Sequence, residues 1–280
     1  MAELVGAFAA SHAPLIARDW HLLPAATRDR LAAALRELGR RVEALKPDVI
    51  VEVAPDHWVN FFINNLPTVC IGVGEEHEGP PEPFLKDFPH KDMKGHPELA
   101  HHILKTALDR DFEPSVSHHM KLDHGFCIPL MRMELKELPR LIPVVINSLE
   151  FPMPSLRRCV AWGKLIADAV ASYPENLRVV VLTTGGLSHS IGEATMGDID
   201  EDLDRRTIEA FKREPESKLL SFLDKELETA GNGTHEVRNW LVAHGAAGGR
   251  GFELVDYLPV PEVYVGCAFA SWNLAQNPAR

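Results

Sequence analysis

The sequence lacks the patterns that mark several common classes of protein. Its four cysteines are widely spaced and form no CxxC pair, which argues against a thiolate zinc site. It has no run of about 18 apolar residues that could span a membrane. Its N-terminus lacks the charged and apolar blocks of a signal peptide. We therefore expect a reduced, soluble, cytoplasmic protein that makes no membrane contact.

Positive charge is also scarce in this chain. Its 280 residues include 29 Lys and Arg against 40 Asp and Glu, so the formal net charge is -11. This balance argues against a nucleic-acid partner, which normally meets a basic face. A small anionic substrate is still compatible with it, because a pocket can be locally positive. No P-loop, GxGxxG or G-x-S-x-G motif occurs, so neither a phosphate loop nor a serine hydrolase elbow is indicated.

Two histidines follow apolar segments that we predict to be β-strands. Residues 4–9 lead into His12, and residues 49–53 lead into His57. Between them, residues 25–45 place apolar side chains at helical spacing and predict an amphipathic helix. Strand, helix and strand in this order indicate a parallel βαβ unit. Because ligands of such sheets bind beyond the carboxyl ends of the strands, we expect both histidines at one edge of the sheet.

The rest of the chain continues the alternation of strands and helices. Further strands are predicted at residues 69–73, 114–117, 141–146 and 178–182 and within 257–270, and helices at 97–108, 128–135 and 155–172 and within 198–246. Residues 74–95 read as a long loop, a length typical of functional segments such as lids. No repeat, low-complexity segment or linker divides the chain. We therefore predict one α/β domain over residues 1–280, with a central mixed sheet flanked by helices.

We interpret His12, His57 and Glu236 as the ligands of one metal ion. Thr234 is predicted to be the N-cap of the helix that carries Glu236. Two histidines and one carboxylate leave adjacent positions open on the metal, as is typical of non-haem Fe(II) oxygenases. The alternative is structural: the histidines are ordinary loop residues, and Glu236 is an acid at the positive end of a helix dipole.

His124 and His189 are the candidates for proton transfer. Glycines adjoin both segments, so the backbone can approach a ligand closely. Imidazole is the usual proton-transfer group near neutral pH, and Asp123 is a candidate to orient a histidine. The alternative is that both are surface residues of turns. We interpret the histidine pairs at 101–102 and 118–119 as structural or solvent-facing.

Five motifs support a resemblance to a known family. They are Ser11-His12-Ala13-Pro14, Pro55-Asp56-His57, Asp123-His124-Gly125, Gly185-Gly186-Leu187-Ser188-His189 and Thr234-His235-Glu236. On these motifs, and over nearly its whole length, the chain resembles the class III extradiol ring-cleavage dioxygenases. Residues 94–100 and 154–172 are more similar to the protocatechuate 4,5-dioxygenase β subunits. The second, third and fifth motifs are more similar to the 2,3-dihydroxyphenylpropionate 1,2-dioxygenases.

The resemblance implies an α/β sandwich that cleaves a catecholic ring with O2 in aromatic catabolism. It implies Fe(II) bound by His12, His57 and Glu236, with His124 and His189 as the acid–base and substrate-contacting histidines. Our hypothesis is that His189 is the base and His124 the proton donor, and the sequence leaves the opposite assignment open. The resemblance also implies a substrate similar to protocatechuate, gallate or 2,3-dihydroxyphenylpropionate, in a homo-oligomer whose site is closed by a small accessory subunit or by residues 74–95. Two alternatives are a non-enzymatic binding protein of the same fold and a zinc-containing enzyme for DOPA-type catechols, against which Glu236 argues.

Overall fold

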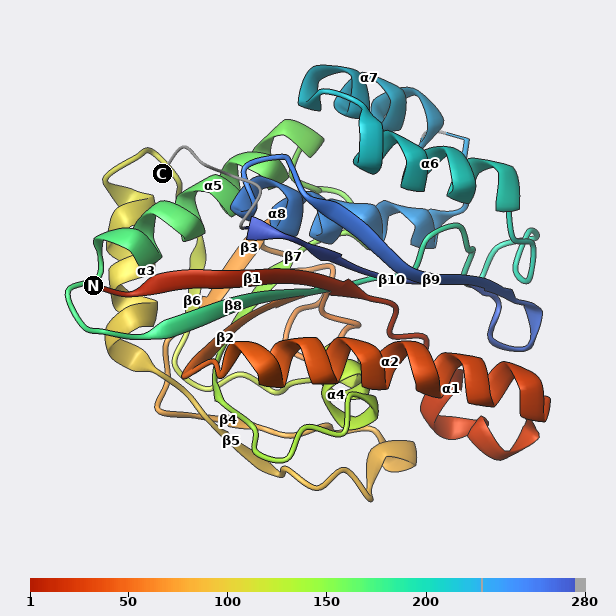
Figure 1. Ribbon diagram of the computed structural model, residues 1–280, viewed down its shortest axis with the longest axis horizontal. Helices are drawn as coiled ribbons and strands as arrows, with labels where there is room; N and C mark the ends of the chain where they lie inside the picture. The colour runs from red at the N-terminus through yellow and green to blue at the C-terminus, as the bar shows by residue number, and fades with distance from the viewer. Residues whose placement is uncertain (228, 275–280) are drawn as a thin grey trace.

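An eight-stranded mixed sheet forms the centre of the molecule, with the strand order β6-β3-β7-β2-β8-β1-β10-β9 (Figure 1). The computed structural model describes residues 1–227 and 229–274. The strands of this sheet are β1 (Glu3–Ala10), β2 (Val49–Ala54), β3 (Val69–Gly72), β6 (Ser115–Ser117), β7 (Arg140–Ile146), β8 (Arg178–Thr184), β9 (Phe252–Val260) and β10 (Val265–Trp272). A separate hairpin consists of β4 (Glu76–Glu78) and β5 (Asp92–Lys94).

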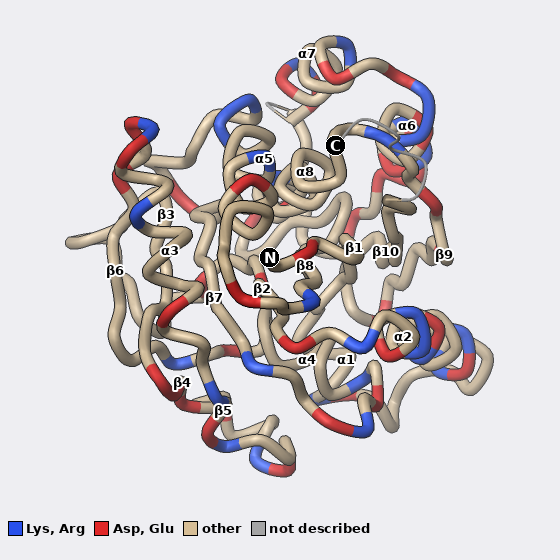
Figure 2. The backbone as a smooth tube through the Cα atoms, turned by 60° about the vertical axis from the view of Figure 1, so that its left-hand side comes forward, with Lys and Arg blue, Asp and Glu red and all other residues tan. Residues whose placement is uncertain are grey.

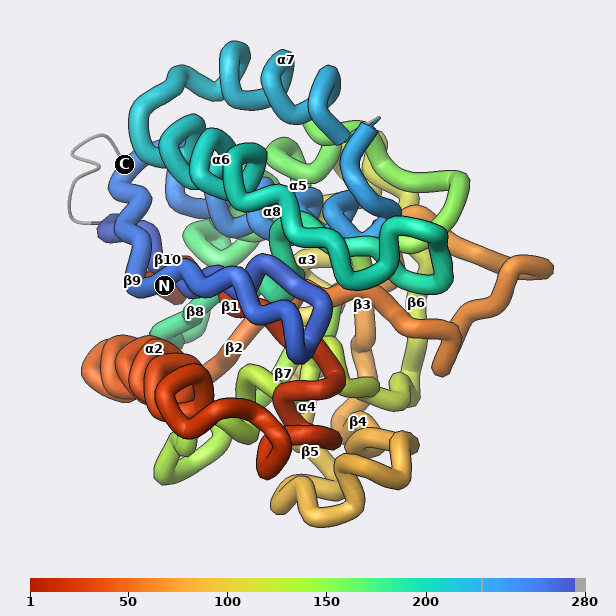
Figure 3. Tube along the Cα trace, turned by 90° about the vertical axis from the view of Figure 1, so that its right-hand side faces the viewer, coloured from red at the N-terminus to blue at the C-terminus, as the bar shows by residue number. Residues whose placement is uncertain are grey.

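Helices cover both faces of the sheet (Figures 1 and 3). They are α1 (Leu15–Arg18), α2 (Ala25–Leu45), α3 (Pro97–Leu108), α4 (His124–Arg132), α5 (Leu156–Ser172), α6 (Glu201–Arg213), α7 (Glu216–Glu226) and α8 (Val237–Ala246). Buried residues of α2 and α4 share one core with Ile50, whereas those of α3, α5 and α8 share the other core with Val49 and Val51. Successive side chains of a strand point to opposite faces, so β2 contributes to both cores.

The middle of the sheet is parallel, and this arrangement positions the site. Strand β8 lies between β1 and β2 and is parallel to both, and β7 continues the parallel set beyond β2. The outer pairs β7–β3, β1–β10 and β10–β9 are antiparallel. The carboxyl ends of β1, β8 and β2 therefore lie next to one another at a single edge of the sheet. These buried strands are rich in valine, as expected where helices cover both faces.

The predicted α/β fold with a central mixed sheet flanked by helices is confirmed. The helix at residues 25–45 has the predicted bounds, and the parallel relation of the first two strands is also confirmed, although β8 separates them.

Charged residues gather on the helices and loops around the central strands (Figure 2). Within the described residues, no helix combines the length and apolar character needed to cross a membrane.

Three local predictions were wrong. The helix expected at residues 128–135 begins at His124, because the Asp123 side chain accepts a hydrogen bond from the Gly125 N–H and caps it early. Thr234 is not an N-cap: it lies inside a short 3-10 helix, Asn232–Glu236, and α8 begins directly after Glu236. Residues 74–95 are not one irregular loop, since they contain the β4–β5 hairpin.

Candidate metal centre and active site

All five side chains predicted for the site line one cavity of about 550 Å³. They are His12, His57, His124, His189 and Glu236. His12, His57 and His189 follow β1, β2 and β8, His124 opens α4, and Glu236 directly precedes α8. The parallel strand order therefore brings together residues that lie more than 200 positions apart in the sequence.

The carboxylate of Glu236 lies between two imidazoles. Its Oε1 is 3.3 Å from Nε2 of His12 and 3.6 Å from Nε2 of His57. The other nitrogen of each ring is already engaged: Nδ1 of His12 lies 3.0 Å from Oγ1 of Thr184, and Nδ1 of His57 lies 3.1 Å from Oδ2 of Asp123. Both rings are thus oriented with Nε2 toward Glu236, as metal-ligating histidines are in proteins.

These separations fit a shared metal ion. Two ligand atoms that each lie about 2.1 Å from a metal are roughly 3.0 Å apart in octahedral and roughly 3.4 Å apart in tetrahedral geometry. The separation of 3.3 Å between Oε1 of Glu236 and His12 falls within this range, and that of 3.6 Å to His57 lies about 0.2 Å above it, so a small movement of His57 would complete the set. Its Oε2 atom accepts a hydrogen bond of 2.6 Å from the Gly186 N–H, which holds the carboxylate in place. The donor set suits a divalent cation.

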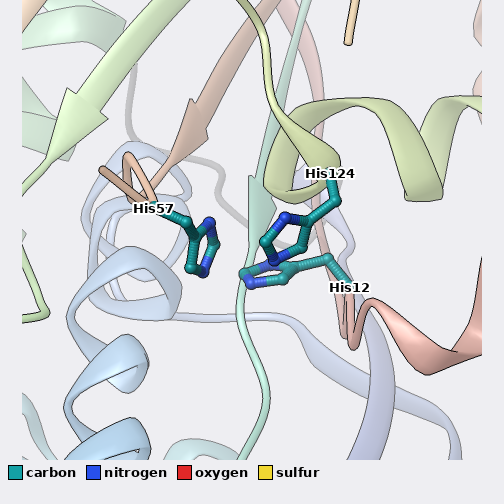
Figure 4. Close-up of side chains that lie close together, drawn as sticks. All are labelled: His12, His57 and His124. Carbon is teal, nitrogen blue, oxygen red and sulfur yellow. The ribbon is translucent and has the colours of Figure 1, made fainter. Parts of the chain in front are cut away.

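His124 is the third imidazole of this cluster (Figure 4). Its ring centroid lies 4.0 Å from that of His57 and 5.7 Å from that of His12, and the three rings point toward one another. Each of the three offers a nitrogen within 4.8 Å of the others, so a set of three histidines is a second geometric possibility for the metal. The Glu82 carboxylate lies 2.8 Å from Nδ1 of His124 and also accepts a hydrogen bond from its backbone N–H.

His189 also lies close to Glu236. Its Nε2 lies 3.8 Å from Oε2 of Glu236. Its Nδ1 lies 2.7 Å from the Leu187 carbonyl oxygen, and because a carbonyl can only accept, Nδ1 carries the proton. In the neutral ring, Nε2 is therefore a free acceptor that lines the cavity.

Residues 6–267 match the model of the family described as the catalytic LigB subunit of aromatic ring-opening dioxygenase. The chain belongs to the LigB family. It is an enzyme of the extradiol catechol dioxygenase class, which confirms the predicted family and enzyme class. LigB dioxygenases depend on a metal, and the histidine cluster of this chain is a candidate site for one.

Two curated relatives are similar along most of their length. A 2,3-dihydroxyphenylpropionate/2,3-dihydroxicinnamic acid 1,2-dioxygenase of Klebsiella pneumoniae is 27% identical, over 86% of this chain and 90% of the relative. An enzyme of the same description from Pseudomonas putida is 29% identical, over 90% of this chain and 93% of the relative. The crystal structure of an uncharacterized Escherichia coli K12 protein aligns with a TM-score of 0.61 at 15% identity, covering 95% of this chain and 99% of that one, and shows the same fold.

The electrostatics of this LigB-family site favour ionised carboxylates. Burial opposes ionisation of Glu236, but His12 and His189 outweigh it and hold the pKa of Glu236 well below its usual range. Burial likewise disfavours a charged His57, yet Asp123 and Glu236 raise the pKa of His57 to about 10. A cation that binds here must displace the proton of His57, so metal binding is coupled to proton release.

Burial has the opposite outcome at His124. Burial lowers the pKa of His124, and the charge of His57 adds to this effect, so the ring is neutral at pH 7 in spite of Glu82.

A buried carboxylate, Asp204, supports the segment that carries His189. It accepts hydrogen bonds from the N–H (2.7 Å) and hydroxyl (2.9 Å) of Ser188 and from the hydroxyl of Tyr257 (2.8 Å).

Sequence reasoning missed two supporting residues and left one unassigned. Thr184 ends β8 and orients His12, and it could have been noticed as a polar residue at the end of an apolar strand. Glu82 lies between β4 and β5, where no sequence pattern indicates its role. Asp123 was a candidate to orient a histidine, and the structure shows that this histidine is His57 rather than its neighbour.

Proposed function

We propose that this chain binds Fe(II) through His12, His57 and Glu236 and cleaves a catechol ring beside its two hydroxyl groups. One observation carries the proposal: Oε1 of Glu236 lies 3.3 and 3.6 Å from Nε2 of the two histidines, whose Nδ1 atoms are both held by other partners. Two histidines and a carboxylate are the ligand set of non-haem Fe(II) oxygenases.

Charge favours Glu236 over His124 as the third ligand. Glu236 stays ionised although it is buried, and a metal at Oε1 would supply the compensating charge when it replaces the protons of the neighbouring imidazoles. His124 is instead held by Glu82 and remains free for proton transfer. A set of three neutral histidines, as found at some zinc sites, would leave the Glu236 charge uncompensated.

Bound Fe(II) supplies adjacent coordination positions for the catechol oxygens and for O2, and the electronic pathway between them. The overall reaction puts both oxygen atoms of O2 into a single ring-opened product. It requires no external reductant, because the cleaved carbon–carbon bond supplies the electrons. The residues of the chain bind the ring, exclude water and move protons.

His189 is the base in this proposal. Its Nε2 has no proton in the neutral ring, because Nδ1 donates to the Leu187 carbonyl, so it can accept a proton from a catechol hydroxyl. His124 supplies a proton later in the reaction, after taking one up. Since burial lowers the pKa of His124, its protonated form gives the proton up readily, and Glu82 keeps the ring in position.

Substituted catechols are the substrates that this site would take. Protocatechuate, gallate and 2,3-dihydroxyphenylpropionate share the adjacent hydroxyl groups that bind at the metal, and the last is named for the relatives. O2 uptake by the Fe(II)-loaded protein with each of them, and with catechol itself, tests the activity.

The iron content of purified variants distinguishes a ligand set that includes Glu236 from one that includes His124. Glu236→Ala should lose tightly bound iron, whereas His124→Ala should retain iron and lose turnover. Glu137→Ala, at an exposed glutamate, is the control for loss of one carboxylate and should behave as wild type. Full iron content and activity in Glu236→Ala would contradict the proposed site.

A further inference from the structure

The cavity changes character between its inner end and its mouth. At the inner end, His12 and Glu236 are only 2% and 3% exposed. At the mouth, large apolar side chains reach solvent: Trp58 (40% exposed), Ile191 (51%), Met196 (47%) and Tyr264 (37%). They come from the segments after β2 and β8 and from the β9–β10 connection. Exposed apolar side chains that border a cavity indicate a site for an apolar ligand group.

The cavity is also larger than a single catechol ring would fill. A volume of about 550 Å³ falls within the range of roughly 300–1,000 Å³ that is typical of pockets for drug-sized ligands. A catechol is a single ring that would occupy the inner end, next to the histidines. Leu149, Val263 and Val265 add further apolar lining to the cavity.

The mouth is held in shape by hydrogen bonds. The Asn232 side chain accepts a hydrogen bond of 2.8 Å from the Ile191 N–H and donates one of 2.9 Å to the Ile191 carbonyl. This reciprocal pair joins the segment after β8 to the 3-10 helix that contains Glu236. The exposed side chain of Ile191 therefore projects from a backbone position that hydrogen bonds hold in place before a ligand binds.

Few charges are available to a substrate carboxylate. Apart from the histidines and Glu236, the charged residues among the described ones that line the cavity are Arg18 and Glu150, which have opposite signs. The Arg18 guanidinium already makes two hydrogen bonds to Asp19, of 3.0 Å from Nε and 2.7 Å from Nη2. A substrate carboxylate would have to replace Asp19 as the partner of Arg18, and Glu150 would repel an anion.

We propose that the preferred substrate is a catechol with a bulky apolar substituent, such as an aryl group, rather than a carboxylated catechol. The substituent lies against Ile191, Met196 and Tyr264, while the hydroxyl groups reach the histidine end of the cavity. This inference rests on the proposed function. It differs from the carboxylated substrates named for the relatives, because it follows from the apolar mouth and the paired arginine of this chain.

A substrate series tests the inference. With Fe(II)-loaded protein and O2 uptake as the readout, the better of 3-phenylcatechol and 4-phenylcatechol should exceed 2,3-dihydroxyphenylpropionate and protocatechuate in kcat/KM by at least about tenfold. A carboxylated catechol as the best substrate, with a preference that Arg18→Gln removes, would overturn the inference while leaving the ring-cleavage activity intact. If no catechol causes O2 uptake, the proposed function itself fails, and this inference fails with it.

Variants of the mouth test where the substituent lies. In the double variant Ile191→Ser and Met196→Ser, the ratio of kcat/KM for phenylcatechol to that for catechol should fall about tenfold. Anaerobic calorimetry should show weaker phenylcatechol binding and a less negative heat-capacity change, since less apolar surface is buried. Leu108→Ser, on α3 with a similar exposure of 54%, is the matched control and should leave the ratio unchanged.

A different occupant of the mouth would give a different result. If the double variant leaves the substrate ratio and the binding heat unchanged but alters the molecular mass in sedimentation experiments, the apolar mouth contacts a protein. That occupant would be a second copy of the chain or an accessory subunit. Such an outcome overturns the inference about the substrate.

Discussion

The carboxylate of Asp123 lies 3.1 Å from Nδ1 of His57, although 66 positions separate the two residues. It also accepts hydrogen bonds from the backbone N–H of His57 (2.6 Å) and of Gly125 (2.8 Å). One side chain therefore orients a candidate metal ligand and begins the helix that carries His124. Its ionised state is favoured, because His57 outweighs the effect of burial and lowers the pKa of Asp123.

Replacing Asp123 with Asn should weaken metal binding by about 10- to 100-fold, the usual cost of losing the partner of a metal-ligating histidine. The measurement is iron affinity by chelator competition. Glu82→Gln makes the same chemical change beside His124 and should lower kcat while keeping iron affinity close to that of wild type. Equal losses of affinity in both variants would show that His124 is a ligand as well.

Gly233 allows the close approach of His189. A Cβ atom at this position would lie 2.1 Å from Nε2 of His189, so Gly233→Ala must displace the ring. We expect kcat to fall by at least about tenfold, since proton transfer depends on a placement within a few tenths of an ångström. Gly39→Ala is the control and should keep the wild-type kcat, because a Cβ there makes an equally close contact, 2.1 Å from the Met133 carbonyl oxygen, at a residue that does not line the cavity. Unchanged kcat in Gly233→Ala would exclude His189 from proton transfer.

Asp204 should make stability depend on pH. Burial raises the pKa of this carboxyl from 3.8 to about 6, against the hydrogen bonds from Ser188 and Tyr257. The native state therefore holds the proton more tightly than the unfolded state, and its stability falls as pH rises from about 4 to about 6. Relative to Asp204→Asn, the free energy of unfolding of the wild type should decrease by about 2 kcal/mol across this window.

Urea denaturation of the two proteins at a series of pH values measures that difference. The comparison with Asp204→Asn removes the contributions of all other titrating groups, provided that they are the same in both proteins. A constant difference between about pH 4 and pH 7 would mean that the pKa of Asp204 is not raised in the native state.

Glu52 is expected to lower the stability of the sheet. It is fully buried in β2, and neither of its carboxylate oxygens has a hydrogen-bond partner among the described residues. Burial, together with the charge of Asp123, raises its pKa well above the usual range and so favours the neutral carboxyl. Glu52→Met keeps a similar shape without the unpaired oxygens and should raise the free energy of unfolding by about 1–3 kcal/mol.

Thermal unfolding of Glu52→Met and Glu52→Gln separates shape from polarity. The Gln variant keeps a buried polar group and should show no gain. A less stable Met variant would show that the carboxyl has a partner, such as a buried water molecule. A more stable Met variant with a lower kcat would show that Glu52 is retained for the neighbouring Asp123 and His57 at the expense of stability.

Much of the fold could be predicted from local patterns. The helix at residues 25–45 has apolar residues at regular spacing, and the strand at residues 49–54 is apolar and β-branched along most of its length, so both segments specify their own structure. The start of α4 could not be predicted in this way. It depends on the Asp123 side chain, which both caps the helix and contacts His57 from a distant part of the chain.

The candidate site was predicted unevenly for a similar reason. His12 and His57 could be placed because each follows a strand of a parallel pair, and this topology determines where strand ends meet. Glu236 lies in a 3-10 helix outside the sheet, where no strand-end argument applies, so its prediction depended most on the resemblance to a family. Glu82 could not be found at all, since its contact with His124 exists only once the segment between β4 and β5 has folded against α4.

The position of β8 between β1 and β2 also has a consequence for folding. The histidines that follow β1 and β2 become close neighbours only after β8, over 120 residues beyond β2 in the sequence, has paired with both strands. No short fragment of the chain therefore contains the cluster, and an unfolded chain has no preformed site. A metal that binds there stabilises the native state alone, by RT ln(1 + [metal]/Kd), so the midpoint of thermal unfolding should rise with metal concentration.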